Sequence, residues 1–286
     1  MRVRSLWRYP VKTMQGEPLD HTDVAPDGIP GDRWWALRDE TRGAITGGRR
    51  FGRLMAASAR FRDDGPTGAG PEPSHVDITL PDGRLIGSDS DEVDTVLSEF
   101  LDAPVTLWPR VPASEKAHFR RQRLTPWAMA ADLARLMGVE RGEALPRFHR
   151  LPPTLLFTET LPGTYFDCAH LLLLTSATLD ALSRRLPDSR IDVRRFRPNV
   201  VLDAGASAAD YPEQRWIGCK IRIGGCIAKI TSTCPRCLMT TRAFDDLPED
   251  RTILRTIARE MGRNAGVYAM VVEPGPISVG DTAALL

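Results

Sequence analysis

The sequence predicts a β-rich α+β protein, built as a barrel or a folded sheet with a few helices around it. Two observations support this prediction. Short stretches of alternating apolar and polar residues recur along the chain and are bounded by glycine, proline or aspartate. Apolar residues at helical spacing occur in only a few segments. With 286 residues, the chain can form one large domain or two ordinary ones.

The first hundred residues have the pattern of strands and turns. Residues 1–11 (MRVRSLWRYPV) alternate in polarity, and residues 33–39 (RWWALRD) are rich in aromatic side chains. Residues 75–86 (HVDITLPDGRLI) form a hairpin pattern around a central Asp-Gly pair. Residues 91–102 carry an apolar stripe at helical spacing, which predicts a short helix.

The second half has a sharper pattern after a connector. Residues 110–165 are rich in proline and arginine, with one helical pattern at 126–138. Residues 170–175 (HLLLLT) predict a buried strand, and 176–186 predict a helix with Ser176 as its N-cap.

The remaining elements alternate between strands and one helix. Residues 195–203 (RFRPNVVLD) lead into a strand, and 217–234 predict two strands that turn at a Gly-Gly pair. Residues 247–262 predict a helix with Pro248 near its start and a glycine past its end. Residues 266–286 predict two closing strands.

The composition argues against several functional classes. The net charge of +1 gives no global reason to expect binding to nucleic acid or an anionic membrane. No run of about 18 apolar residues predicts a membrane span. The first residues lack the apolar stretch of a signal peptide, so we expect a cytoplasmic protein. In that compartment, its five cysteines are expected to be thiols or ligands rather than disulfides.

Cys234 and Cys237 lie three residues apart in the stretch TSTCPRCLMTT. A structural zinc site needs four ligands, commonly in two close pairs, and Cys219 and Cys226 are too widely spaced to form the second pair. A thioredoxin-like redox pair requires a helix N-terminus after a strand. Both interpretations are weak, and we expect Cys168, Cys219 and Cys226 to be small buried hydrophobic residues.

Basic residues occur in two contexts that suit an anion. Arginines precede Pro198 and Asn199 at the start of a predicted strand, where they could hold an anion or simply form a solvated loop. Lys12 and Thr13 could bind a phosphate through a charge and a hydroxyl group. They do not form a P-loop, because no glycine-rich run precedes them.

Several stretches occur together in an order that resembles one family. They are LWRYPVKTMQG, GIPGDRWWAL, GTYFDCAHLLLLT, RRFRPNVVL, CPRCLMTT and the closing GVYAMVVEPGPISVGD. The chain resembles two-domain MOSC proteins, which include the mitochondrial amidoxime-reducing component and related bacterial reductases. The resemblance implies an N-terminal β-barrel-like domain at 1–105, a connector with a helix at 106–149, and a MOSC β-barrel with peripheral helices at 150–286.

The resemblance also implies a molybdenum cofactor (molybdopterin) in the cleft between the two domains. Cys237 matches the cysteine that binds molybdenum in such reductases, and a soft thiolate suits that metal. The other matching positions are expected to contact the phosphate or pterin, or to line the cofactor pocket. They are Lys12, Thr13, Arg33, Asp167, Arg197, Asn199 and Arg236.

The function implied by the resemblance is reduction of small N-hydroxylated compounds, with electrons from a separate flavoprotein, ferredoxin or b-type cytochrome. An alternative is a carrier of the molybdenum cofactor, or a sulfur carrier that uses a persulfide on Cys237. The sequence departs from the family around Arg49 and at residues 240–246, in loops expected to shape the substrate entrance. Cys168 also replaces a threonine that is frequent in the family.

Overall fold

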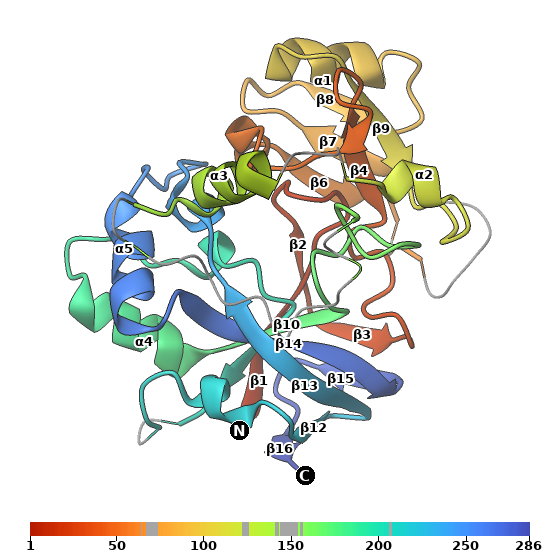
Figure 1. Ribbon diagram of the computed structural model, residues 1–286. Coiled ribbons are helices and arrows are strands. Elements are labelled where there is room, and N and C mark those ends of the chain that lie inside the picture. The colour runs from red at the N-terminus through yellow and green to blue at the C-terminus, as the bar shows by residue number, and fades with distance from the viewer. Residues whose placement is uncertain are drawn as a thin grey trace.

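The protein has one large curled sheet, two small three-stranded sheets, one two-stranded sheet and few helices, as the computed structural model shows (Figure 1). The predicted β-rich α+β class is therefore confirmed. The structure describes residues 1–63, 65–66, 74–121, 126–140, 143, 154, 157–205 and 208–286.

The large sheet has eight strands and encloses the main aliphatic core. Its neighbouring strands are antiparallel, except that β10 and β11 run parallel. Fully buried aliphatic side chains such as Leu171, Ile221 and Val267 fill this core. In spatial order the strands are β16 (Ala283–Leu285), β12 (Lys220–Ile223), β13 (Cys226–Pro235), β14 (Asn264–Glu273), β10 (Leu171–Thr175), β11 (Val200–Asp203), β1 (Arg2–Arg8) and β2 (Glu17–Leu19).

The first 24 residues pair with strands from the far end of the chain. β1 is antiparallel to β11, and β3 (His21–Val24) is antiparallel to β15 (Gly275–Ser278). The predicted domain spans of 1–105, 106–149 and 150–286 stay predictions. The strand pairing shows that the start of the chain forms part of the same sheet as the C-terminal half.

The remaining N-terminal residues form a second body with its own core, drawn at the top of Figure 1. The hairpin of β7 and β8 turns at Gly83, whose φ of +86° suits glycine, as the Asp-Gly pair predicts. The predicted helix at 91–102 is also confirmed. The elements of this body are β4 (Trp35–Asp39), β5 (Ala44–Ile45), η1 (Gly52–Ala56), β6 (Ser58–Phe61), β7 (Val76–Thr79), β8 (Leu85–Gly87), α1 (Val93–Leu101) and β9 (Val105–Pro109).

Of the four helices that follow α1, α4 and α5 begin at side-chain caps. The N-cap of α4 is Thr175 rather than Ser176, because Thr175 has an extended backbone and its hydroxyl accepts a 3.2 Å hydrogen bond from the Thr178 amide. Asp250 caps α5 in the same way, and Gly262 follows its end with φ +56°. These helices are α2 (Lys116–Phe119), α3 (Pro126–Met137), α4 (Ser176–Arg185) and α5 (Arg251–Glu260).

The closing segment contains three strands, whereas the sequence predicts two. β14 ends at Glu273, and β15 then leaves the large sheet to pair with β3. The chain returns as β16 to pair with β12. The Gly224–Gly225 turn between β12 and β13 is confirmed. None of the described helices has the length and apolar character needed to cross a membrane.

Candidate functional site

The predicted site residues lie on the loops that enter or leave strands, and several of these loops meet. Two of these residues lie beside short 3-10 turns. Arg197 follows η3 (Val193–Arg195), and Cys237 precedes η5 (Leu238–Thr241). Lys12 and Thr13 follow β1, Arg33 precedes β4, Asp167 precedes β10, Arg197 and Asn199 precede β11, and Arg236 and Cys237 follow β13.

Tyr9 joins two of the predicted arginines. Its ring centroid lies 4.7 Å from the Arg33 guanidinium carbon and 4.2 Å from that of Arg197. The Tyr9 hydroxyl donates a 3.1 Å hydrogen bond to the carbonyl of Pro198. Burial raises the pKa of this hydroxyl above its usual value, so Tyr9 stays neutral beneath both cations. The two arginines therefore share an aromatic platform.

Asp32 and Asn199 fix the position of Arg33. Asp32 is buried, accepts hydrogen bonds from the Tyr9 amide at 2.8 Å and Asn199 Nδ2 at 2.9 Å, and forms an ion pair with Arg33. Asn199 Oδ1 accepts from the Leu172 amide at 3.0 Å and from Arg33 at 3.4 Å. The side chain of Asn199 therefore connects the loop that carries Arg33 to strand β10.

Lys12 and Asp167 form a second pair. Lys12 Nζ lies 2.5 Å from Asp167 Oδ1 and donates a 3.0 Å bond to the carbonyl of Tyr165. Burial opposes ionisation of Asp167, but Lys12 and then Arg49 outweigh it and hold the pKa of the carboxyl well below its usual range. Asp167 is consequently a carboxylate at neutral pH, and contact with solvent favours the same state, since its side chain is 58% exposed.

Arg49 connects this pair to Cys237 and belongs to the site, although the sequence analysis does not select it. Burial lowers the pKa of Arg49, but the charges of Asp167 and then Cys237 outweigh burial and raise it. Cys237 is half-buried and is the N-cap residue directly before η5. Arg49 therefore lies within electrostatic reach of both predicted site residues. Its alignment with the family is the signal that could have selected it.

Three of the predicted site residues have strained backbones. The φ angles of Thr13, Arg33 and Arg197 are +81°, +51° and +54°. Left-handed conformations cost non-glycine residues about 1–3 kcal/mol each, and they cluster at ligand sites. The loops that supply the cations therefore contain backbone conformations that are unfavourable for residues other than glycine.

Arg236 is nearly enclosed by the protein but keeps one free donor. Its Nε donates to the carbonyl of Ala265 at 2.7 Å and its Nη1 to that of Phe196 at 2.8 Å. Its Nη2 is buried and has no hydrogen-bond partner among the described residues. Gly266 leaves room there, since a Cβ would lie 3.2 Å from Nη2. An unmade hydrogen bond of this kind is costly, which points to an acceptor outside the chain.

The site carries more positive than negative charge. Within the described part of the chain, its carboxylates are Asp32 and Asp167, whereas its cations are Lys12, Arg33, Arg49, Arg197 and Arg236. Buried charge without a counter-charge is unfavourable. The arrangement is therefore suited to hold an anionic group by charge-assisted hydrogen bonds.

The cysteines do not all lie where the sequence analysis expects. All five are free thiols, and Cys226 is buried as predicted. Cys168 and Cys219 are half-buried, so the expectation that they are buried is wrong for both. Across the described ranges, no group of three or more His, Cys, Asp or Glu side chains could hold a metal ion.

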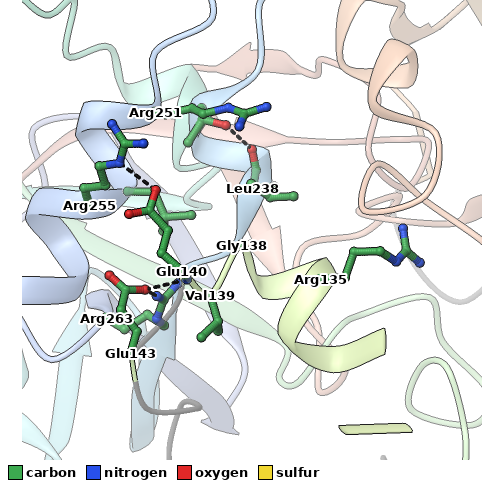
Figure 2. Close-up of a pocket in the computed structure, with 11 residues that line it drawn as sticks. Arg135, Gly138, Val139, Glu140, Glu143, Leu238, Arg251, Arg255 and Arg263 are labelled. Carbon is green, nitrogen blue, oxygen red and sulfur yellow. Dashed lines mark hydrogen bonds and ion pairs between the residues drawn. The ribbon is translucent and has the colours of Figure 1, made fainter. Parts of the chain in front are cut away.

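A cavity of about 240 Å³ lies beside η5, between α3 and α5 (Figure 2). Leu238, which follows Cys237, lines it. Its acidic side chains are paired, Glu140 with Arg255 at 2.6 Å and Glu143 with Arg263. These ion pairs connect the residues after α3 to α5 and to the residue before β14. They therefore hold the region after α3 close to η5, which directly follows Cys237.

Comparisons with known proteins match both ends of the chain to domain families. Residues 160–284 match the model of the MOSC domain, and residues 1–89 match that of the MOSC N-terminal beta barrel domain. Mitochondrial amidoxime reducing component 2 from Bos taurus is 26% identical over 98% of this chain and 81% of its own length. Mitochondrial amidoxime-reducing component 1 from Homo sapiens is 24% identical over 99% of this chain and 82% of its own length.

Two solved structures match part or all of the chain with low TM-scores and low identity. The YUAD protein from Bacillus subtilis has a TM-score of 0.42 and 11% identity, covering 99% of this chain and 93% of its own. YiiM from Geobacillus stearothermophilus has a TM-score of 0.31 and 14% identity, covering 41% of this chain and 54% of its own.

Proposed function

Because the chain belongs to the MOSC family, with both the N-terminal barrel domain and the MOSC domain, we propose that it binds the molybdenum cofactor and reduces N-hydroxylated compounds. The observation that carries the proposal is the cluster of buried or partly buried cations, which lacks sufficient counter-charge and which Arg49 links electrostatically to Cys237. Relatives that match nearly the whole chain are named amidoxime reducing components, which supports oxidoreductase activity.

The residues present fit an anionic cofactor with a thiolate-bound metal. The phosphate and pterin would accept hydrogen bonds from Lys12, Thr13, Arg33 and Arg197, and the free Nη2 of Arg236 offers a further donor. Asn199 and Asp32 would hold Arg33 in place. Cys237 is half-buried, so its thiol is accessible enough to serve as the metal ligand.

When bound, the cofactor supplies the two-electron chemistry needed to convert an N–OH group to N–H with release of water. The reaction also consumes two protons. Asp167 does not provide them, since Lys12 and Arg49 keep its carboxyl ionised. We assign Asp167 to orienting Lys12 and leave proton supply to solvent.

The electrons come from a separate flavoprotein, ferredoxin or b-type cytochrome in this proposal. The relatives are named mitochondrial, whereas we propose a cytoplasmic protein. Its five free thiols suit any reducing compartment. Fractionation of the source cells, followed by immunodetection, separates the two locations.

The ligand assignment is tested by Cys237→Ser. We expect molybdenum, measured by mass spectrometry, and turnover of an aromatic amidoxime both to fall to background, because a hydroxyl is a poor substitute for a soft thiolate. Cys219→Ser is the matched control, as Cys219 is also half-buried, and it should keep the metal. If Cys234→Ser lost molybdenum and Cys237→Ser retained it, our assignment of Cys237 as the ligand would be wrong.

The same preparation distinguishes the reductase from a sulfur carrier. A reductase should contain about one molybdenum per chain and turn over the amidoxime with a chemical reductant. A sulfur carrier should instead contain transferable sulfane sulfur on Cys237 without metal. The second result, obtained with freshly purified protein, would overturn the proposed function.

A further inference from the structure

A second cavity, of about 440 Å³, lies between the N-terminal body and the segment after η5. We call it the seam pocket. Its size is within the usual range for small-molecule sites, and sites of this kind favour the junction between two parts of a chain. Its lining residues are Gly52, Arg53, Ala56, Pro81, Asp82, Phe100, Arg242, Ala243 and Glu249.

The free charges of the seam pocket are positive. Asp82 is neutralised by Arg84 at 2.8 Å, and Glu249 by Arg251 at 3.1 Å. Within the described part of the chain, neither Arg53 nor Arg242 has an acidic partner. Two guanidinium groups are thus available to one ligand, and guanidinium binds a carboxylate through paired hydrogen bonds.

Apolar side chains complete the lining. The Arg53 guanidinium carbon lies 5.4 Å from the centroid of the Phe100 ring, which is mostly buried. Ala56, Pro81 and Ala243 add small apolar surfaces. A flat apolar body could lie against this surface, with its anionic end held by the arginines.

Close packing holds Arg242 at the pocket. Its Nε is buried and has no hydrogen-bond partner among the described residues. Gly52 permits this approach, because a Cβ there would lie only 2.8 Å from Nε. The pocket therefore has one arginine set by packing and one, Arg53, that is exposed and adjustable.

From these observations we propose that the seam pocket binds a small aromatic carboxylate, with Arg53 and Arg242 holding the carboxylate and Phe100 the ring. The inference does not depend on molybdenum or on reductase activity.

Binding is tested with three probes on the full-length protein by ligand-observed NMR titration. Benzoate has both the ring and the charge, acetate has only the charge, and benzamide has the ring without the charge. We expect saturable binding of benzoate, at least tenfold tighter than that of acetate or benzamide. Equal binding of benzoate and benzamide, or no saturable binding of benzoate, would overturn the proposal.

Variants locate the site. Arg53→Gln and Arg242→Gln should each weaken benzoate binding about tenfold or more, the usual consequence of losing one charge-assisted contact. Arg60→Gln is the matched control, an exposed arginine on β6 that does not line the pocket, and it should bind as the wild type does. Since Arg53 is exposed, its variant is expected to fold. Unchanged benzoate binding in Arg53→Gln and Arg242→Gln, or equal weakening in Arg60→Gln, would place the ligand elsewhere.

Discussion

Two arginines that lie two residues apart in RRFRPN show how differently one stretch can use the same side chain. Arg195 and Arg197 are both buried, with exposed fractions of 1% and 8%. Arg195 uses its donors within the chain, whereas Arg197 keeps unused donor capacity beside other cations. We therefore propose a structural role for Arg195 and a ligand-binding role for Arg197.

Arg195 donates only to backbone carbonyls. Its partners are the carbonyls of Arg190 at 3.1 Å, Thr240 at 3.4 Å, Arg242 at 2.9 Å and Pro248 at 2.7 Å. Three of these carbonyls belong to the end of η5 or to the loop after it. Because η5 begins directly after Cys237, Arg195 holds the segment on which the candidate metal ligand depends.

Arg197 makes few contacts for a buried cation. It donates to the carbonyl of Met14 and stacks on Tyr9. Burial and the nearby charge of Arg33 lower the pKa of Arg197 to about 10. Arg197 is thus a buried cation beside another cation, and its φ angle is strained. We infer that a bound anion would offset this unfavourable charge. We therefore infer that the two roles differ in how many hydrogen bonds each guanidinium group makes within the chain.

The Arg195→Ala variant tests most directly whether Arg195 and Arg197 have different roles. It should lower the free energy of unfolding by about 3 kcal/mol or more, because several buried carbonyls lose a charged donor. The measurement is a urea unfolding curve of the protein without cofactor. Arg184→Ala, at an exposed arginine paired with Asp210, is the control and should change stability by less than about 1 kcal/mol. A small effect of Arg195→Ala would remove its structural role.

Arg197→Ala should show the opposite pattern. Without cofactor, its stability should stay within about 1 kcal/mol of the wild type, because removing an uncompensated buried charge offsets the lost packing. With cofactor, affinity should fall by about 1.5–3 kcal/mol, or one to two decades. Cofactor content and release rate measure this. If unfolding curves without cofactor showed Arg197→Ala to be as unstable as Arg195→Ala, the two arginines would have the same role.

The elements with local signals could be predicted from the sequence. The Gly224–Gly225 turn, the Asp-Gly hairpin and helix α5 each depend on neighbouring residues, and all are found. The pairing of β1 with β11 could not be predicted, because it joins residues about two hundred positions apart. The third closing strand was missed for the same reason, since β15 exists only through its pairing with β3.

The candidate site shows the same division. Lys12, Arg33 and Arg197 were selected through family resemblance. The structure places Arg33 and Arg197 over the ring of Tyr9 and pairs Arg33 with Asp32, whereas Lys12 pairs with Asp167. Neither Tyr9 nor Asp32 was predicted. Tyr9 acts through the face of its ring, and Asp32 through bonds to Asn199 and Arg33, so both roles depend on contacts formed only in the folded chain.

Glu213 extends the comparison to a buried acid and has the smallest expected effect. It is fully buried in η4 (Pro212–Trp216) and accepts hydrogen bonds from the hydroxyls of Thr175 at 2.7 Å and Thr178 at 2.6 Å. Its partners are neutral, so burial dominates and raises the pKa of the carboxyl. Like Arg195, Glu213 is satisfied within the chain by hydrogen bonds to neutral groups.

The raised pKa fixes the sign of the pH dependence. The protonated carboxyl favours the folded state, so this contribution to stability is fully present below the ordinary pKa of about 4.3 and is lost as pH rises through the higher folded value. Glu213→Gln removes the titration. Its stability relative to the wild type should therefore increase from pH 4 to pH 8, by about 1.4 kcal/mol for each unit by which the pKa is raised. Urea unfolding at several pH values measures the difference, and Glu249→Gln, at an exposed glutamate, should show no such trend. A Glu213→Gln difference that stays constant with pH would mean that the two threonine hydroxyls fully compensate the buried charge.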